Sequence, residues 1–237
     1  MPSQSDENET RLICPIAHIR NGFTEKFGIP RQSGLADIPS RIIFEPQYRN
    51  PEAFRGLEAY SHLWLIWDFS ETHRDRWSPT VRPPRLGGNT RMGVFATRSP
   101  FRPNSLGLSC VRLDKIEYDP ADGPVLSVTG ADLMDQTPIY DIKPYLPYVD
   151  SIPEAEGGFS DDVKDQSLHV VFPEELAETL TENQSLCLMQ ILAQDPRPHY
   201  QQAAGRVYGM SYDGLEIRFT VDGDTLTVRS VTPGSRS

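Results

Sequence analysis

Arginine and glycine are concentrated in residues 82–109, which read RPPRLGGNTRMGVFATRSPFRPNSLGLS. This segment holds five arginines and no acidic residue, although the whole chain carries a formal net charge of −10. The arginine side chain presents a planar fork of donors that suits carboxylate and phosphate groups. Glycine allows the backbone to approach a ligand closely. These residue types therefore predict a site for an anionic group.

Four aspartates lie in a second segment, residues 131–150, together with three tyrosines and three prolines. Their carboxylates could hold ribose hydroxyls or ammonium groups of a ligand, or could form ion pairs with the arginines, and both interpretations stay open. A third candidate is the Pro30-Arg31-Gln32 turn, which lies in a loop rich in glycine and proline. It presents a cation and an amide, as either a binding loop or a surface turn would.

Common nucleotide, hydrolase and zinc motifs are absent, because the sequence contains no GxGxxG, GxxxxGK[ST], GxSxG or HExxH. Three cysteines, Cys14, Cys110 and Cys187, lie far apart and have no histidine at metal-ligand spacing. We therefore predict that each is a small buried apolar residue, and that the protein has no metal site.

Charge is distributed unevenly along the chain. Residues 73–115 hold nine basic and two acidic residues, whereas residues 150–186 hold ten acidic residues and one lysine. The acidic composition argues against a protein that coats nucleic acid through bulk charge, but a local positive face can still meet a phosphate-rich partner. The polar start has no apolar segment, and no run approaches the length that crosses a bilayer, so we expect a cytoplasmic protein without membrane attachment.

The candidate residues must be positioned by several short strands. Strands are predicted at residues 12–19, 40–44, 63–69, 92–97, 106–116 and 125–130, with a short helix at residues 50–56. The strand at 63–69 is apolar on both faces, as expected for a barrel wall that is covered on both sides. We predict a mainly β fold, in which a disordered tail, residues 1–11, precedes a β-barrel domain, residues 12–150.

The composition changes after residue 150. Residues 151–166 are acidic and contain Pro, Gly and Ser, which is typical of a linker. Residues 167–237 predict a small α+β domain with a strand at 168–172, helices at 173–180 and 181–194, and a meander that turns at Asp213-Gly214 and Asp222-Gly223. The second helix should begin with a capping box formed by Thr181 and Gln184. It should pack through Leu186, Met189, Leu192 and Ala193.

Longer motifs cover residues 15–208 in colinear order. The signature of the TsaA-like family resembles MGVFATRSPFRPNSLGLS. The bacterial full-length members of that family, the TrmO-type tRNA methyltransferases, have blocks that resemble LEAYSHLWLIW, RPPRLGGN, DQTPIYDIKPYLP and LAQDPRPHY. The resemblance implies an S-adenosylmethionine-dependent enzyme that methylates the amine nitrogen of threonylcarbamoyl-adenosine, the modified purine just 3′ of the tRNA anticodon. It also implies a β-barrel methyltransferase domain unrelated to the Rossmann type, and a homodimer.

The resemblance assigns the cofactor pocket to separate parts of the chain. They are the Pro30-Arg31-Gln32 turn, Ser70-Glu71 at the end of the apolar strand, Arg98, the backbone near Leu108, and the loop formed by Asp132, Leu133, Met134 and Asp135. One departure from the family pattern bears on this pocket, because many relatives have His-Gln where the chain has Ser70-Glu71.

Catalysis and RNA binding need further groups. Methyl transfer from a sulfonium is an in-line displacement that depends on alignment, and a carboxylate can take the proton of the acceptor nitrogen. Asp135 and Asp141 are the predicted bases, the alternative being that they only pair with arginines and stabilise the fold. Phosphate contacts to the single-stranded anticodon loop are predicted for five arginines: Arg74, Arg76, Arg82, Arg85 and Arg197.

Two other functions fit the same residues. The first is a non-catalytic barrel that binds S-adenosylmethionine or RNA and acts as a regulator. The second is a methyltransferase for a small-molecule acceptor. The block at residues 195–200 favours a tRNA substrate over a small molecule, because short relatives differ from this chain after the barrel.

Overall fold

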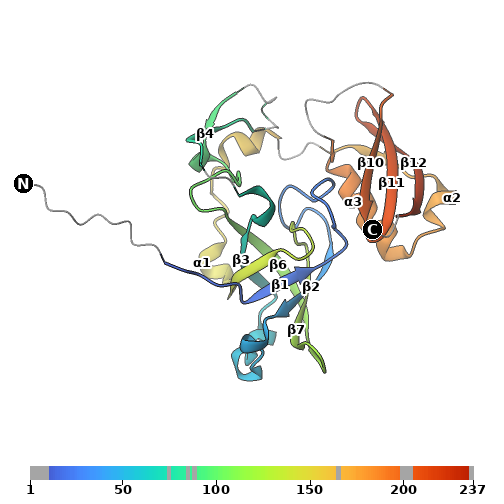
Figure 1. Cartoon of the computed structure of the whole chain (residues 1–237). Helices are drawn as coiled ribbons and strands as arrows, with labels where there is room; N and C mark the ends of the chain where they lie inside the picture. The colour runs from blue at the N-terminus through green and yellow to red at the C-terminus, as the bar shows by residue number, and fades with distance from the viewer. Residues whose placement is uncertain are drawn as a thin grey trace, which may run out of the picture.

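The computed structural model describes residues 11–73, 76–83, 86, 90–163, 167–197 and 205–234. Residues 1–10 of the predicted disordered tail lie outside this part of the chain. Six antiparallel strands close into a barrel in the order β1-β2-β7-β6-β3-β8, seen on the left of Figure 1. Their bounds are β1 Ala17–Arg20, β2 Pro39–Phe44, β3 His62–Asp68, β6 Leu106–Asp119, β7 Gly123–Thr129 and β8 Pro138–Pro144. The predicted β-barrel is confirmed.

Alternating side chains of the strands fill the barrel. On β3, Leu63, Leu65 and Trp67 belong to the inner hydrophobic cluster, which also takes in residues from the other five strands. The side chains between them lie on the outer face and are half-buried. There the ring of Trp64 packs 5.7 Å from the ring of Tyr145, so this strand is covered on both sides, as its apolar sequence predicts.

The predicted strand at residues 92–97 is wrong beyond its first two residues. β5 Met92–Gly93 pairs with β4 Thr80–Val81, and the chain then forms a 3-10 helix, η6 Val94–Ala96. Thr97 ends this helix, where its hydroxyl donates to the carbonyl of Val94 at 2.9 Å. Because β4 offers a ladder of only two residues, the backbone groups that follow find hydrogen bonds within the turn. Val94 is buried, whereas Phe95 is exposed.

Short helices connect the barrel strands or follow the last of them. They are η1 Pro46–Tyr48, η2 Pro51–Phe54, η3 Leu57–Ala59, η4 Ser70–Thr72, α1 Pro147–Asp150 and η7 Gly158–Val163. η2 confirms the helix predicted near residue 50, and the Asn50 side chain caps it by accepting from the backbone N of Glu52 at 3.1 Å. η7 lies inside the segment that is predicted to be a linker, so that segment contains ordered structure.

The C-terminal part is a four-stranded sheet in the order β10-β11-β12-β9, with helices packed against it. Its elements are β9 His169–Val171, α2 Glu174–Ala177, α3 Glu182–Ala193, β10 Val207–Tyr212, β11 Leu215–Asp222 and β12 Thr225–Pro233. The meander turns where predicted, because Asp213, Gly214 and Gly223 adopt positive φ. Together with the barrel, this sheet and its helices confirm the mainly β fold class.

The buried face of α3 differs from the predicted one. Cys187, Leu188, Ile191 and Leu192 are buried, whereas Leu186 and Met189 are exposed. Apolar residues occupy nearly every position from Leu186 to Leu192, so helical periodicity alone does not select one stripe. The sheet selects it, since the same cluster contains the inward side chains of β10, β11 and β12.

The predicted capping box at the start of α3 is confirmed. The Thr181 hydroxyl accepts from the backbone N of Gln184 at 3.2 Å, and the Gln184 side chain accepts from the backbone N of Thr181 at 3.1 Å. We expect Thr181→Ala to lower the free energy of unfolding by about 1 kcal/mol, because a helix donor loses its partner. Thr181→Ser keeps the hydroxyl and should retain most of the stability. Urea denaturation of both variants measures the difference, and equal loss in the two would contradict the capping role.

The three cysteines have different environments. Cys187 is buried and Cys110 is intermediate, but Cys14 is exposed. The prediction of burial is therefore wrong for Cys14, which lies in the extended segment before β1. None of the described helices has the length and apolar character needed to cross a bilayer.

A long loop, residues 21–38, packs between the barrel and the C-terminal sheet. Its side chains Phe23, Ala36 and Ile38 belong to the hydrophobic cluster of the C-terminal sheet, although they precede β2 in the chain. Hydrogen bonds tie the same loop to α3, where the Gln190 side chain accepts from the backbone N of Asp37 at 2.7 Å. In Figure 1 the C-terminal sheet stands beside the barrel, with α3 on the side of the sheet that lies toward the barrel. The loop that carries the Pro30-Arg31-Gln32 turn is thus held by both parts of the protein.

Candidate active site

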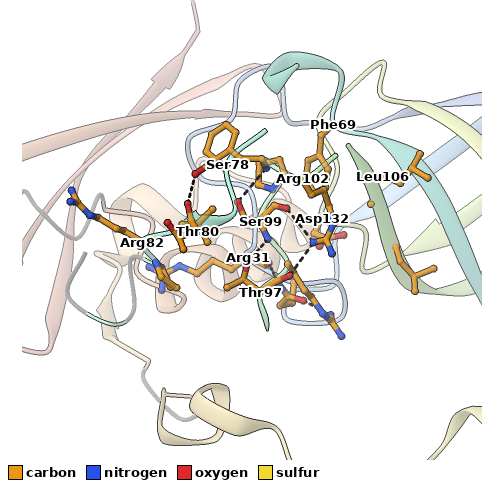
Figure 2. A pocket seen from close by; sticks show the side chains of 18 of the residues that line it. Arg31, Phe69, Ser78, Thr80, Arg82, Thr97, Ser99, Arg102, Leu106 and Asp132 are labelled. Atoms are coloured by element: carbon orange, nitrogen blue, oxygen red, sulfur yellow. Dashed lines mark hydrogen bonds between the residues drawn. The ribbon is translucent and has the colours of Figure 1, made fainter. Parts of the chain in front are cut away.

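A cavity of about 1070 Å³ opens where the barrel meets the β4–β5 hairpin. Residues from four separate parts of the chain line it, and Figure 2 shows the side chains of most of them converging from both sides. The loop 21–38 contributes Pro30, Arg31 and Gln32, and the barrel contributes Trp67, Phe69, Leu106, Gly107, Leu108 and Asp132. The hairpin and the loop after it contribute Ser78, Thr80, Val81, Arg82, Pro83, Arg91, Thr97, Arg98, Ser99, Pro100, Phe101 and Arg102, and η7 contributes Phe159.

A hydrogen-bonded chain of three side chains forms the barrel side of the cavity. The indole Nε1 of Trp67 donates to the hydroxyl of Ser109 at 2.9 Å, and that hydroxyl donates to Oδ1 of Asp132 at 2.5 Å. Ser109 is fully buried and Trp67 is 6% exposed. Because each donor has its acceptor, this buried polar chain holds the Asp132 carboxylate in one orientation.

Trp67 lies flat against the backbone of β6. A Cβ atom added at Gly107 would stand 2.2 Å from Cε2 of Trp67, far inside van der Waals contact. The ring of Phe69 packs 4.2 Å from the Trp67 ring between centroids. Glycine at position 107 therefore lets the indole reach Ser109, and an aromatic surface forms beside the carboxylate.

Among the described residues that line this cavity, Asp132 is the only acidic one. Burial raises the pKa of its carboxyl group, while the hydrogen bond from Ser109 and the positive charge of Arg98 oppose that rise. A carboxylate with a raised pKa is a stronger base than an exposed aspartate. The site thus combines one basic carboxylate with an apolar surface and several guanidinium groups.

Hydrogen bonds within the loop at residues 97–102 fix its shape. The Thr97 hydroxyl accepts from the backbone N of Ser99, and the Ser99 hydroxyl accepts from the backbone N of Phe101, each at 3.3 Å. The Arg102 guanidinium donates to the carbonyls of Thr97 and Ser99 at 3.0 and 3.3 Å. Arg102 therefore stabilises the loop, and the loop presents Arg98.

Arg98 and Arg31 meet through Gln32. The Arg98 guanidinium donates to the side-chain oxygen of Gln32, and the Gln32 side-chain nitrogen donates to the carbonyl of Arg31 at 2.5 Å. Arg31 in turn donates to the carbonyl of Asp195 at 2.8 Å. This chain of contacts connects the barrel loops to the segment after α3.

The cavity brings together six of the residues predicted to bind the cofactor. They are Pro30, Arg31, Gln32, Arg98, Leu108 and Asp132. Five others are not among its lining residues: Ser70, Glu71, Leu133, Met134 and Asp135. Ser70 and Glu71 lie on η4, where the Glu71 carbonyl accepts from Lys26 Nζ at 2.6 Å. Leu133 is buried in the barrel cluster. Their contact with a cofactor stays a prediction.

The two aspartates predicted as bases lie away from the cavity wall. Oδ1 of Asp135 accepts from the backbone N of Asn21 at 3.0 Å and lies 3.8 Å from Nε of Arg20, so this carboxylate holds the start of the loop 21–38. Asp141 is on β8 opposite Ile66, and its Oδ2 pairs with Lys143 Nζ at 2.9 Å. The contact of Asp135 with Arg20 matches the alternative of pairing with an arginine, whereas the partner of Asp141 is a lysine. The catalytic role of either residue stays a prediction.

The predicted RNA-binding arginines are in different surroundings. Arg76 and Arg82 are exposed, and Arg82 lines the cavity. The side chain of Arg197 is 11% exposed, and its guanidinium forms two hydrogen bonds with the Asp195 carboxylate, at 2.8 and 2.9 Å. Arg74 and Arg85 lie outside the described residues.

Sequence reasoning missed Trp67, Ser109 and Phe159 as parts of the site. The signal for Trp67 and Ser109 was their place near strand ends that flank the predicted arginine loop, with Gly107 two residues before Ser109. No local signal marks Phe159, because its segment has the composition of a linker. Its place at the cavity depends on tertiary packing alone.

Removing the Ser109 hydroxyl should change the ionisation of Asp132. The hydrogen bond from Ser109 lowers the pKa of the carboxyl group, so Ser109→Ala raises that pKa further. If the ionised form is required, the acidic limb of the kcat/KM profile then moves to higher pH. Ser40→Ala is the matched control, because the buried Ser40 hydroxyl has no hydrogen-bond partner among the described residues. An unmoved acidic limb in Ser109→Ala would contradict this coupling.

Two family models match the chain. The model described as tRNA-methyltransferase O N-terminal domain matches residues 18–151, and the TrmO C-terminal domain model matches residues 165–234. The chain belongs to the tRNA-methyltransferase O family. The resemblance drawn from the sequence motifs is confirmed.

Bacterial relatives in this family match along nearly their whole length. A tRNA (adenine(37)-N6)-methyltransferase from Escherichia coli K12 is 39% identical over 92% of this chain and 96% of its own length. A protein of the same description from Eikenella corrodens is 46% identical over 73% of this chain and 97% of its own. The crystal structure of TrmO from Pseudomonas aeruginosa superposes with a TM-score of 0.78 at 35% identity, covering 97% of this chain and 100% of that one.

The cavity fits the methyl donor that the family resemblance implies. S-adenosylmethionine combines a flat purine, a positive sulfonium and a zwitterionic amino acid end. Trp67, Phe69 and Phe101 supply aromatic and apolar surface. Asp132 supplies a negative charge beside them, and the guanidinium groups that line the cavity supply donors for a carboxylate. These side chains therefore match each part of the donor.

Proposed function

We propose that this chain is an S-adenosylmethionine-dependent methyltransferase that acts on N6 of adenine 37 in tRNA. Family membership along both matched regions supports the activity. The observation that carries the proposal is the cavity at the barrel mouth, which gathers Pro30, Arg31, Gln32, Arg98, Leu108 and Asp132 from distant parts of the sequence. We further propose that the acceptor is the threonylcarbamoyl form of that adenosine.

The residues of the cavity perform three tasks in this reaction: they orient the ligands, exclude water and accept a proton. When bound, S-adenosylmethionine supplies an electrophilic methyl group. The Trp67 ring, fixed against Gly107 and hydrogen-bonded to Ser109, orients ligands on the barrel side and excludes water. Such positioning is worth about 7–11 kcal/mol of an activation barrier. The acceptor nitrogen is conjugated with the purine and a carbonyl group, so loss of its proton assists attack on the methyl carbon.

Asp132 is the lining residue that can accept this proton. Its carboxylate faces the cavity and is held by the Ser109 hydroxyl at 2.5 Å, and burial raises its pKa. Asp135 and Asp141 remain the bases predicted from the sequence, and variants of all three distinguish among them. In each case the carboxylate would take the proton that the acceptor nitrogen loses when the methyl group passes from sulfur to nitrogen.

The remaining features concern the partner, the assembly and the location. We propose that the anticodon loop of tRNA approaches the face on which Arg76, Arg82 and Arg91 are exposed, since cations attract the phosphate backbone. We also propose that the protein acts as a homodimer in the cytoplasm. Sedimentation of the purified protein tests the dimer.

Methyl transfer by the purified protein tests the activity. The protein is incubated with isotopically labelled S-adenosylmethionine and with tRNA that carries or lacks the threonylcarbamoyl group. Mass spectrometry of the nucleosides should find one added methyl group on the modified adenosine only. Donor binding without transfer would indicate a regulator instead, and transfer to small molecules but not to tRNA would indicate the other alternative.

A further inference from the structure

A second cavity, of about 680 Å³, adjoins the first. The two cavities share Arg31, Gln32, Pro83, Thr97, Arg98 and Phe159 as lining residues. Because the same side chains face both spaces, the partition between them is one layer of side chains thick. A ligand in the second cavity therefore lies within a short distance of a ligand in the first, which is the arrangement that group transfer between two substrates requires.

The walls of the second cavity suit a flat ring that carries a negative charge. Leu35, Phe95, Ala96 and Phe159 provide apolar surface, and Gln32 provides an amide. Arg31 and Arg98 provide guanidinium groups, while none of the described residues that line it is acidic. A purine with an attached carboxylate has this combination of an apolar face, amide-like edges and an anionic end.

An exposed aromatic pair stands at the edge of this cavity. Phe95 is 73% exposed and Trp77 is 50% exposed, and their rings are stacked with centroids 6.2 Å apart and planes 29° apart. Phe95 is held in place by its neighbours in η6, since Val94 is buried and Thr97 caps the helix. Aromatic rings fixed in this way at a surface are typical of sites that stack unpaired nucleobases.

We propose that the second cavity is the acceptor subsite, in which the target purine stacks on Phe95 and its acyl carboxylate faces Arg31 and Arg98. Trp77 continues the stack and receives a neighbouring base of the anticodon loop. This assignment rests on the proposed function and deepens it. It assigns the exposed pair to RNA, because the guanidinium groups of the cavity, whose described lining holds no acid, match an anionic partner.

Three substitutions at Phe95 test the subsite. An anticodon stem–loop RNA that carries threonylcarbamoyl-adenosine is titrated against Phe95→Ala, Phe95→Leu and Phe95→Tyr in the full-length protein. Stacking predicts that the Kd for this RNA rises about 10- to 100-fold in Phe95→Ala and Phe95→Leu but is retained in Phe95→Tyr. Calorimetric affinity for S-adenosylmethionine should stay unchanged in all three. Tyr118→Ala, which removes an aromatic ring that is 63% exposed on β6, is the matched control and should bind RNA normally.

Two results would overturn the subsite. The first is methyl transfer by the wild-type protein together with normal RNA affinity in Phe95→Ala. The second is a changed sedimenting mass in Phe95→Ala together with wild-type sedimenting mass and wild-type RNA affinity in Phe95→Leu. That result would make Phe95 an apolar contact between two copies of the chain. Wild-type protein that binds the stem–loop through Phe95 but transfers no methyl group would support the subsite and count against the proposed function alone.

Discussion

Asp132→Asn is expected to lower kcat for methyl transfer to tRNA about 100-fold or more at saturating donor, because the cavity loses its basic carboxylate. The same change should leave the protein folded. Burial raises the pKa of Asp132, which means that the charged form is disfavoured in the folded state, and an amide of the same shape avoids that cost. Activity and stability should therefore separate. Single-turnover rates and thermal unfolding of the variant measure the two effects.

Asp135→Asn and Asp141→Asn provide the comparison. Asp135 secures the start of the loop 21–38 through the backbone N of Asn21, so its amide variant should lose some donor affinity and some stability. Asp141 pairs with Lys143 at the surface, and Asp141→Asn should behave like the wild type. Normal kcat in Asp132→Asn together with a large loss in Asp135→Asn or Asp141→Asn would refute the assignment to Asp132.

Gly107→Ala should have the second largest effect. Its new methyl group would collide with the Trp67 ring at 2.2 Å, so the indole must leave its place and release Ser109. Overpacking of this kind costs about 1–3 kcal/mol of folding free energy. Donor affinity should fall as well, because the displaced ring enters the cavity. Thermal unfolding and calorimetric titration with S-adenosylmethionine measure both.

Gly93→Ala is the matched control for that substitution. Gly93 has φ near −59° and no atom within 4 Å of an added Cβ, so alanine fits there without strain. We expect its melting temperature to equal or slightly exceed that of the wild type. A Gly107→Ala protein with the same melting temperature as Gly93→Ala would show that the Trp67 ring can move without loss of stability.

The strands were the most predictable part of the fold. The strand at residues 40–44 and the Asp-Gly turns at residues 213–214 and 222–223 are predicted from local sequence, and the structure agrees at each place. The strand prediction for residues 92–97 is wrong beyond Gly93. Six apolar or small residues form a strand only if another strand pairs with all of them. That partner is decided by the tertiary fold and not by the segment itself.

The candidate site likewise has some parts that the sequence predicts and others that depend on the tertiary fold. The Pro30-Arg31-Gln32 turn, Arg98 and Asp132 were expected from the family motifs, and they line one cavity. The clustering of acidic residues in the sequence predicts Asp135 or Asp141 as the base. Asp135 lies three residues after Asp132, yet it turns towards Asn21. The direction of a side chain in an irregular loop depends on distant contacts, such as that between Ser109 and Asp132, that no local pattern contains.

The loop 21–38 couples the stability of the C-terminal sheet to that of the turn at Arg31. Phe23 and Ile38 are buried among the side chains of the C-terminal sheet, so that sheet cannot open without exposing them and loosening the turn at Arg31. A ligand bound to the native turn stabilises it in proportion to the logarithm of ligand concentration above Kd. Donor saturation should therefore slow amide hydrogen exchange in β10 and β11, which contribute no residue to the cavity. The C-terminal sheet thus acts as a remote reporter of donor occupancy.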